Sequence, residues 1–169
     1  WSVSRNARPR CQFTGSRHAI GVSSGTAGLH LCVRAAGIAD GDLVITTPFS
    51  FVASANVLLF ERAVPIFVDV DPASGNIDPA LVRQATQDLI RGGAAARRWL
   101  PRSGFTPGAS ALPLKALLPV DVFGQPADLD PLLDTARDFG LSVIEDSCEA
   151  LGAEYKGRRA GVLGDAGCF

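Results

Sequence analysis

The sequence contains no methionine, only two histidines and no closely spaced pair of cysteines. His18 and His30 have no partner at a spacing typical of metal ligands, and there is no C-x-x-C pair, so we expect no metal site. Scattered cysteines of this kind are typical of a cytoplasmic protein, in which we expect them to be reduced and mostly buried. They are Cys11, Cys32, Cys148 and Cys168.

An excess of charge of either sign is also absent. The 16 basic and 17 acidic residues leave a net charge of -1, which gives no reason to expect a nucleic acid or an anionic membrane as a partner. No apolar run reaches the roughly 18 residues of a membrane-spanning helix, and no signal peptide opens the chain. With 47% hydrophobic residues and a mean hydropathy of +0.20, the 169 residues suffice for one domain with an apolar core.

The two ends of the chain are unusual. It begins with Trp1, and it ends at Phe169 inside an apolar run. Together with the lack of methionine, these ends lead us to expect a fragment of a longer protein.

Apolar segments of strand length alternate with helical segments along most of the chain. This order predicts an α/β fold with a mainly parallel sheet and right-handed crossovers. Residues 1–16 lack a clear period, and residues 91–115 are broken by glycine and proline, so we expect both segments to be irregular. Residues 154–160 predict a small hairpin. The predicted strands are 18–22, 43–46, 64–68, 116–120 and 141–144, and the predicted helices are about 29–36, 50–60, 79–90 and 128–139.

Three of the predicted loops lie beyond the carboxyl ends of strands, where parallel sheets bind ligands. Gly25 and Thr26 lie in a strand-to-helix turn, which can bind an anion through unpaired N–H groups, or can simply be an N-cap. Phe51 can stack on a flat ligand or pack in the core. Asp146 can bind a ring cation, a metal or a ribose hydroxyl, or can begin a solvated turn with Glu145.

Taken together, these groups favour two kinds of ligand. A phosphate, a flat ring and a ring cation are the three parts of pyridoxal phosphate that such loops can bind. A nucleotide fits as well, with the aromatic ring on the base and the carboxylate on the ribose. A Rossmann dinucleotide site is disfavoured, because no G-x-G-x-x-G follows the first strand.

Several sequence blocks, in order, resemble one enzyme family. The chain is similar, from about residue 17 to residue 169, to the pyridoxal-phosphate-dependent sugar aminotransferases called the DegT/DnrJ/StrS family, within the fold-type I aminotransferases. That resemblance implies a three-layer sandwich, with residues 17–169 as part of the large cofactor-binding domain. The blocks that carry it are residues 22–27, 41–48, 51–54, 64–71, 120–128, 143–152, 155–157 and 164–166.

The resemblance also implies roles for individual residues. The amides of Gly25 and Thr26 would bind the cofactor phosphate, and Phe51 would stack on the pyridine ring. Asp146 would pair with the protonated ring nitrogen, which keeps the ring a good electron sink. Glu149 would lie beside the cofactor, at a position where the family more often has glutamine or histidine.

One expected residue is missing. The family holds its cofactor as a Schiff base on a lysine that would lie beyond Phe169, and neither Lys115 nor Lys156 matches that position. The family's small carboxyl-terminal domain is also absent, and residues 91–115 are an insertion. The chain therefore contains no predicted catalytic residue, and we expect it to be inactive alone.

For the whole protein, the resemblance implies a homodimer that transfers an amino group from glutamate or a similar donor to a keto group of a nucleotide-linked sugar. Three alternatives stay open. One is a truncated, non-catalytic domain that binds pyridoxal phosphate. Another is a nucleotide-binding α/β module of a different family. The last is a lyase or dehydratase of the same family, with histidine in place of the lysine.

Overall fold

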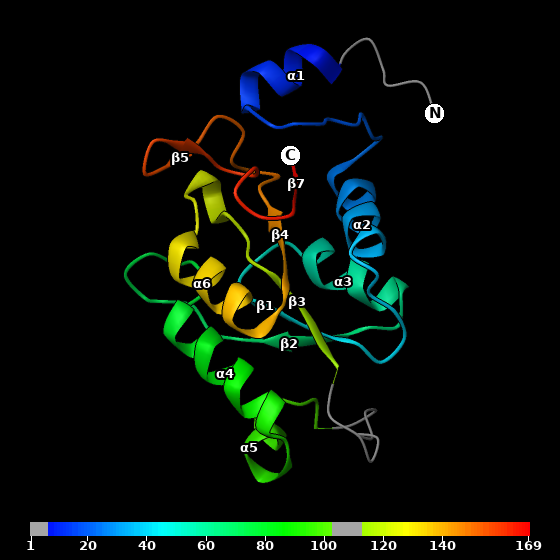
Figure 1. Cartoon of the computed structure of the whole chain (residues 1–169), viewed down its shortest axis with the longest axis vertical. Coiled ribbons are helices and arrows are strands. Elements are labelled where there is room, and N and C mark those ends of the chain that lie inside the picture. The colour runs from blue at the N-terminus through cyan, green and yellow to red at the C-terminus, as the bar shows by residue number, and fades with distance from the viewer. Residues whose placement is uncertain (1–6, 103–112) are drawn as a thin grey trace.

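The computed structural model describes residues 7–102 and 113–169, and at their centre lies a five-stranded sheet (Figure 1). The strand order is β2-β1-β3-β4-β7, and each neighbouring pair is parallel. The prediction of an α/β fold with a mainly parallel sheet is therefore confirmed. The strands are β1 (Leu43–Thr46), β2 (Val64–Phe67), β3 (Leu114–Leu118), β4 (Ser142–Asp146) and β7 (Ala166–Cys168).

Helices cover both faces of the sheet, which gives the predicted three layers (Figure 1). Because successive strand residues point to opposite faces, Leu43 and Ile45 of β1 pack on one side and Val44 packs on the other. Helices α4 (Pro79–Arg91) and α6 (Leu129–Phe139) cover the first side, and α2 (Gly25–Ala35) and α3 (Ala53–Phe60) cover the second. None of the helices in the described ranges is long and apolar enough to cross a membrane.

Local signals set the ends of the helices on the first side. Asp78 accepts hydrogen bonds from the N–H groups of Ala80 and Leu81, and Pro79 occupies the first turn of α4. Gly140 ends α6 in the left-handed conformation. Both helices consequently start and stop within one residue of their predicted bounds.

The predicted hairpin is also present. Strands β5 (Glu154–Tyr155) and β6 (Arg158–Arg159) pair antiparallel, and Lys156 and Gly157 form the turn with φ of 51° and 74°. Asp130, in the first turn of α6, accepts hydrogen bonds from Lys156 (2.7 Å) and from Arg158. These contacts fix the hairpin over the start of α6.

The prediction of an irregular segment at 1–16 is wrong for Ala7–Thr14, which forms helix α1. Proline is tolerated in the first helical turn, where Pro9 lies, and Gly15 follows the helix with a φ of 77°. These two signals were in the sequence, but the lack of an apolar period obscured them. Phe13 lies against the Arg159 guanidinium, 5.1 Å from the ring centroid, so α1 packs on the hairpin. Residues 1–6 lie outside the described ranges.

The predicted strand at 18–22 is absent from the structure. This segment has no regular secondary structure and pairs with no strand among the described residues. Its β-branched residues suit a pleated surface only where a neighbouring strand supplies partners. Ile20, which is 78% exposed, has no such neighbour.

The prediction of an irregular segment at 91–115 is wrong at both ends of that segment. Helix α4 continues to Arg91, a short helix α5 spans Gly93–Arg97, and β3 already begins at Leu114. Three consecutive alanines favour α5, and the positive φ of Gly92 separates it from α4. Trp99 then donates its indole N–H to Asp88 of α4 at 3.0 Å, which folds the segment back. Residues 103–112 lie outside the described part of the chain.

Candidate functional site

The carboxyl ends of the parallel strands meet at one edge of the sheet. From β1 the chain moves to β2 on one side and then returns to β3 on the other, so the strand order reverses at β1. Ligands of open α/β sheets bind beside such a reversal. Thr46 at the end of β1 donates to the carbonyl of Leu118 at the end of β3 (2.8 Å), and Asp146 ends β4 next to them.

A buried serine joins Asp146 to helix α3. Ser54 donates its hydroxyl to Asp146 Oδ2 at 2.6 Å, and the same hydroxyl oxygen lies 3.3 Å from the carbonyl oxygen of Phe51. Ser54 is 2% exposed and Asp146 is 6% exposed. Oδ1 of Asp146 accepts one long bond, 3.3 Å, from the N–H of Cys148. That oxygen therefore retains the capacity to accept a further donor.

Helix α2 begins at this edge with Gly25 and Thr26. Ser24 caps the helix by accepting the N–H of Ala27 at 3.2 Å, as the simpler interpretation of this turn predicts. The first N–H groups of a helix have no partner within it, and no acceptor in the described part of the chain engages those of Gly25 and Thr26. The turn is thus both an N-cap and a suitable anion site.

Two cysteines bring the start of α2 beside the end of β4. A Cβ atom at Gly25 would lie 2.6 Å from Cys148 Sγ, and Cys168 donates its thiol to the Gly25 carbonyl at 3.3 Å. A hydrogen bond between the thiols raises the pKa of Cys148 and lowers the pKa of Cys168. All four cysteines are free, but Cys168 alone among them is buried, so the expectation of mostly buried cysteines is wrong.

Phe51 precedes α3 and is 75% exposed, so it does not pack in the core. Its backbone carbonyl is within reach of the Ser54 hydroxyl that binds Asp146. An exposed aromatic side chain, on a residue whose backbone adjoins the Ser54–Asp146 pair, can stack on a flat ligand. The structure therefore brings together Gly25, Thr26, Phe51 and Asp146.

Glu149, the fifth predicted residue, is exposed and binds the backbone of another loop. Its Oε2 accepts the N–H of Phe123 at 2.9 Å, within the 3₁₀ turn η1 (Val122–Gly124). Phe123 has a φ of 53°, which is rare for a bulky residue, and its ring packs edge-on against Phe49 with 5.9 Å between centroids. Sequence reasoning missed Phe123, because a left-handed aromatic residue has no signature in the sequence.

Two carboxylates that sequence reasoning did not assign to the site lie beneath it. Glu145 is fully buried and accepts three backbone N–H groups from residues 161–164, so it is not part of a solvated turn. Asp121 is 1% exposed and accepts the Ser147 hydroxyl at 2.6 Å. Burial raises the pKa of both carboxyl groups. Glu145 thus binds the segment at residues 161–164, and Asp121 binds Ser147 and the N–H of Ala127.

Comparison with known proteins identifies the family. The profile of the DegT/DnrJ/EryC1/StrS aminotransferase family matches residues 3–169. The chain belongs to this family. Aminotransferases of the family depend on pyridoxal phosphate. The alternative of a nucleotide-binding α/β module from a different family is therefore excluded.

Individual relatives agree with the assignment. GDP-perosamine synthase from Caulobacter vibrioides is 39% identical over 157 residues, which cover 93% of this chain and 36% of that protein. A DegT DnrJ EryC1 StrS aminotransferase from Brucella abortus matches with a TM-score of 0.84 and 29% identity, over 98% of this chain and 40% of that chain. NtdA from Bacillus subtilis, solved with bound cofactor PMP, matches with a TM-score of 0.72 and 26% identity, over 94% of this chain and 31% of that chain. The chain thus spans about a third of the length of its relatives.

The residues at the sheet edge fit this cofactor. Free N–H groups at a helix start suit its phosphate, an exposed aromatic side chain suits its ring, and a carboxylate with an available oxygen suits its ring nitrogen. Among residues 7–102 and 113–169, no cluster of three or more histidine, cysteine, aspartate or glutamate side chains could hold a metal ion.

Proposed function

We propose that this chain is the cofactor-binding part of an aminotransferase that transfers an amino group to a keto group of a nucleotide-linked sugar. The observation that carries the proposal is the convergence of Gly25, Phe51 and Asp146, from three separate segments, at the carboxyl edge of one parallel sheet. The name of the Caulobacter vibrioides relative, GDP-perosamine synthase, supports a nucleotide-linked sugar. Residues 17–169 form part of the large domain in this proposal.

Each residue has one role in the proposed site. The N–H groups of Gly25 and Thr26 bind the phosphate, and Phe51 stacks on the ring. Asp146 keeps the ring nitrogen protonated, because a neighbouring opposite charge favours the charged form by about 1–3 pKa units. When bound, pyridoxal phosphate supplies a sink for the electrons left on a substrate carbon that loses its proton. Glu149 acts beside the cofactor by holding the loop of Phe123.

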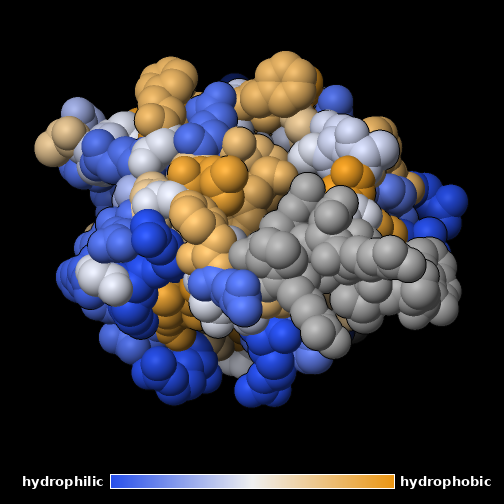
Figure 2. Space-filling model, turned by 90° about the horizontal axis from the view of Figure 1, so that it is seen from above, coloured by the Kyte–Doolittle hydropathy of each residue, from blue (hydrophilic) through white to orange (hydrophobic). Residues whose placement is uncertain are grey.

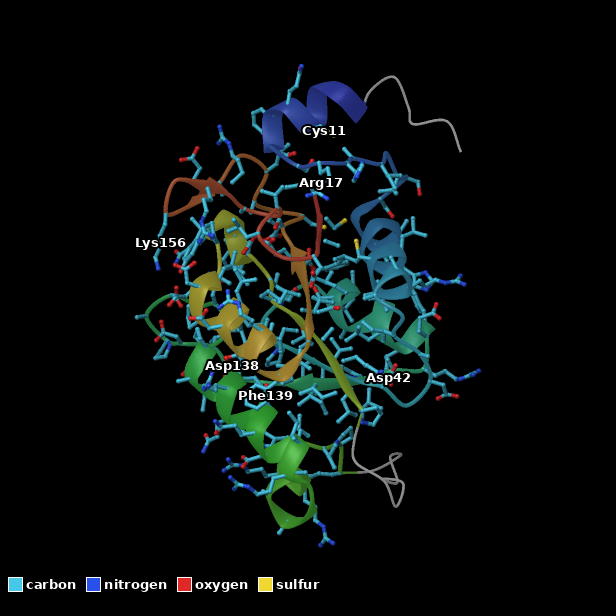
Figure 3. All side chains as sticks on the ribbon, in the orientation of Figure 1. Cys11, Arg17, Asp42, Asp138, Phe139 and Lys156 are labelled. Carbon is cyan, nitrogen blue, oxygen red and sulfur yellow. The ribbon has the colours of Figure 1, made fainter. Side chains whose placement is uncertain are left out.

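We infer that the chain binds its cofactor without a covalent bond. The lysines are Lys115 and Lys156. Lys156 forms an ion pair with Asp130 at 2.7 Å and lies on the outside of the molecule (Figure 3). Lys115 is exposed near the amino end of β3, away from the carboxyl edge. By itself the chain therefore binds cofactor but does not turn over substrate.

The proposal extends to the whole protein, as a cytoplasmic homodimer that takes its amino group from glutamate or a similar donor. Support for a homodimer comes from the end of the molecule that carries α1 and the carboxyl terminus. Apolar side chains gather across the middle of this face (Figure 2), and extended apolar patches are typical of interfaces. Large exposed apolar residues of the chain include Ile20 (78%), Leu151 (65%) and Phe13 (52%).

Binding of pyridoxamine 5'-phosphate tests the proposed site, because this form of the cofactor needs no lysine. We expect the chain to bind it, and Asp146→Asn to weaken binding at least about tenfold, since the ring nitrogen loses its counter-charge. Fluorescence titration measures the affinity. Asp130→Asn is the matched control, because it neutralises an exposed carboxylate on the hairpin side and should leave binding unchanged.

Two results would contradict the proposal. One is equal affinity of the Asp146→Asn variant and the unmodified chain. The other is a chain whose melting temperature rises with AMP or NAD but not with the pyridoxamine compound.

A further inference from the structure

Ser54 has three oxygen neighbours and only one proton. Its Oγ lies 2.6 Å from Asp146 Oδ2, 2.8 Å from Ser50 Oγ and 3.3 Å from the Phe51 carbonyl oxygen. The carboxylate and the carbonyl can only accept, and the bond to the ionised group is the shorter and stronger of the two. The Ser54 proton therefore points to Asp146, and the Ser50 hydroxyl donates to Ser54.

The two hydrogen bonds, from Ser50 to Ser54 and from Ser54 to Asp146, fix the orientation of the Asp146 carboxylate. Ser54 occupies Oδ2, so Oδ1 is the oxygen that retains room for another donor. Both side chains are almost completely buried, and a hydrogen bond is stronger away from water. Ser54 also belongs to the first turn of α3, next to Phe51. One hydroxyl group thus sets the position of the carboxylate relative to the aromatic residue.

We propose that Ser54 is a positioning residue for the ring nitrogen of the cofactor, holding Asp146 by Oδ2 so that Oδ1 faces that nitrogen, with Ser50 as its support. The inference rests on the proposed function, because it takes Asp146 as the partner of the ring nitrogen. In this role Ser54 acts only through Asp146.

The Ser54 hydrogen bond has a second consequence, for the location of the proton. By holding Oδ2, Ser54 directs the negative charge of Asp146 toward the ring nitrogen. A nearby negative charge favours the protonated form of that nitrogen. Removing the hydroxyl group should therefore change the protonation of the ring as well as the affinity.

Nitrogen NMR of bound pyridoxamine 5'-phosphate, labelled with ¹⁵N in its ring, tests this directly, because the chemical shift reports ring protonation. We expect Ser54→Ala to lower the pKa of the bound ring nitrogen by about one unit and the affinity by about tenfold. Ser54→Thr keeps the hydroxyl and should restore both values. Ser50→Ala removes only the outer donor and should produce a smaller shift in the same direction.

Ser147→Ala is the matched control. Ser147 is also buried, lies next to Asp146 in the chain and makes a bond of the same length, 2.6 Å, but to Asp121. This variant should lower the melting temperature and leave the ¹⁵N signal unchanged. Equal ¹⁵N shifts in the Ser54→Ala and Ser147→Ala variants would show a merely structural role and overturn the inference.

The outcomes also separate this inference from the proposed function. If Asp146→Asn deprotonates the ring and Ser54→Ala does not, the role of Ser54 is wrong and the proposed site stands. If the unmodified chain does not bind the labelled compound, the proposed site fails and the inference fails with it.

Discussion

Gly28 allows helix α2 to approach β7 closely. A Cβ atom at this position would lie 2.5 Å from Cys168 Sγ, and Cys168 is buried with its thiol bound to Gly25. We expect Gly28→Ala to destabilise the fold by about 1–3 kcal/mol through overpacking. Thermal unfolding measures the loss. Adding Cys168→Ala removes the clashing sulfur and should restore part of the stability, whereas additive losses in the double variant would contradict this explanation.

The contribution of Asp121 to the stability of the protein should depend on pH. Its pKa is raised from 3.8, mainly by burial, so ionised Asp121 is less favourable in the folded than in the unfolded protein. This cost is present at neutral pH and disappears as the pH falls through the raised pKa toward 3.8. Asparagine can keep both hydrogen bonds, since its oxygen accepts from Ala127 and its amide donates to Ser147.

Asp121→Asn should therefore stabilise the protein at pH 7.5 by about 1 kcal/mol, or about 2–4 °C in melting temperature. The advantage should shrink when both proteins are compared near pH 4.5. Calorimetry at the two pH values measures the difference. A constant advantage, or a loss of stability at neutral pH, would show that burial of the charge is not the dominant effect.

At the residue scale, the sequence predicted where single residues lie in strands and helices better than it predicted their hydrogen-bond partners. The positions of Asp146 at the end of a strand and of Gly25 at the start of a helix could be predicted, because local patterns mark both boundaries. Ser54 could not, because its bond to Asp146 joins residues 92 positions apart. The partner of Glu149 could not be predicted either, because Phe123 is 26 residues away in a conformation that sequence patterns do not encode.

At the scale of elements, one turn of α6 contains both a core residue and a residue of a surface ion pair, so their contributions to stability can be compared. Leu132 is 1% exposed in the core between α6 and the sheet, so Leu132→Ala should destabilise the protein by about 2–5 kcal/mol. Asp130 binds Lys156 and Arg158 at the surface, where ion pairs contribute little, so Asp130→Ala should cost much less than Leu132→Ala, and less still in high salt. Urea denaturation at two salt concentrations measures both losses. A larger loss for Asp130→Ala would mean that the hairpin is part of the cooperative core.

Elements with a strong local pattern were predicted best. Strands β1 and β2 match the sequence prediction within one residue, because apolar runs of this length are bounded by turn residues. Helix α1 was missed, since it lacks an apolar stripe and takes its position from contacts with the hairpin. The segment at 18–22 failed for the opposite reason, because a strand needs a neighbour that no local pattern can supply.

At the scale of the whole molecule, the sheet formed by the described residues has β2 at one edge and β7 at the other. Val64 and Val68 donate their N–H groups toward β1, to Asp42 (2.8 Å) and Thr46 (2.9 Å). Backbone groups alternate along a strand, so Pro65 faces the outer edge, where it offers no N–H. Proline at a free edge discourages pairing with a further strand.

Pro65→Val restores the missing donor at the outer edge of β2. We expect this variant to associate at lower protein concentration than the unmodified chain, because β-branched residues at an open edge favour strand pairing. Static light scattering over a dilution series measures the association. A variant that remains as monodisperse as its parent would show that the edge is protected by something other than proline.

The placement of Pro65 makes the sheet extendable in one direction. The carbonyl of Cys168 accepts the N–H of Ser147, which follows β4, so the backbone groups of Cys168 face β4. Because backbone groups alternate along a strand, those of the preceding residue, Gly167, face away from β4. Any strand that enlarges this sheet, whether it comes from the same polypeptide or from another molecule, should therefore add beside β7. Growth of the sheet would then take place at the β7 edge, whose neighbour β4 ends at Asp146, and not at the β2 edge.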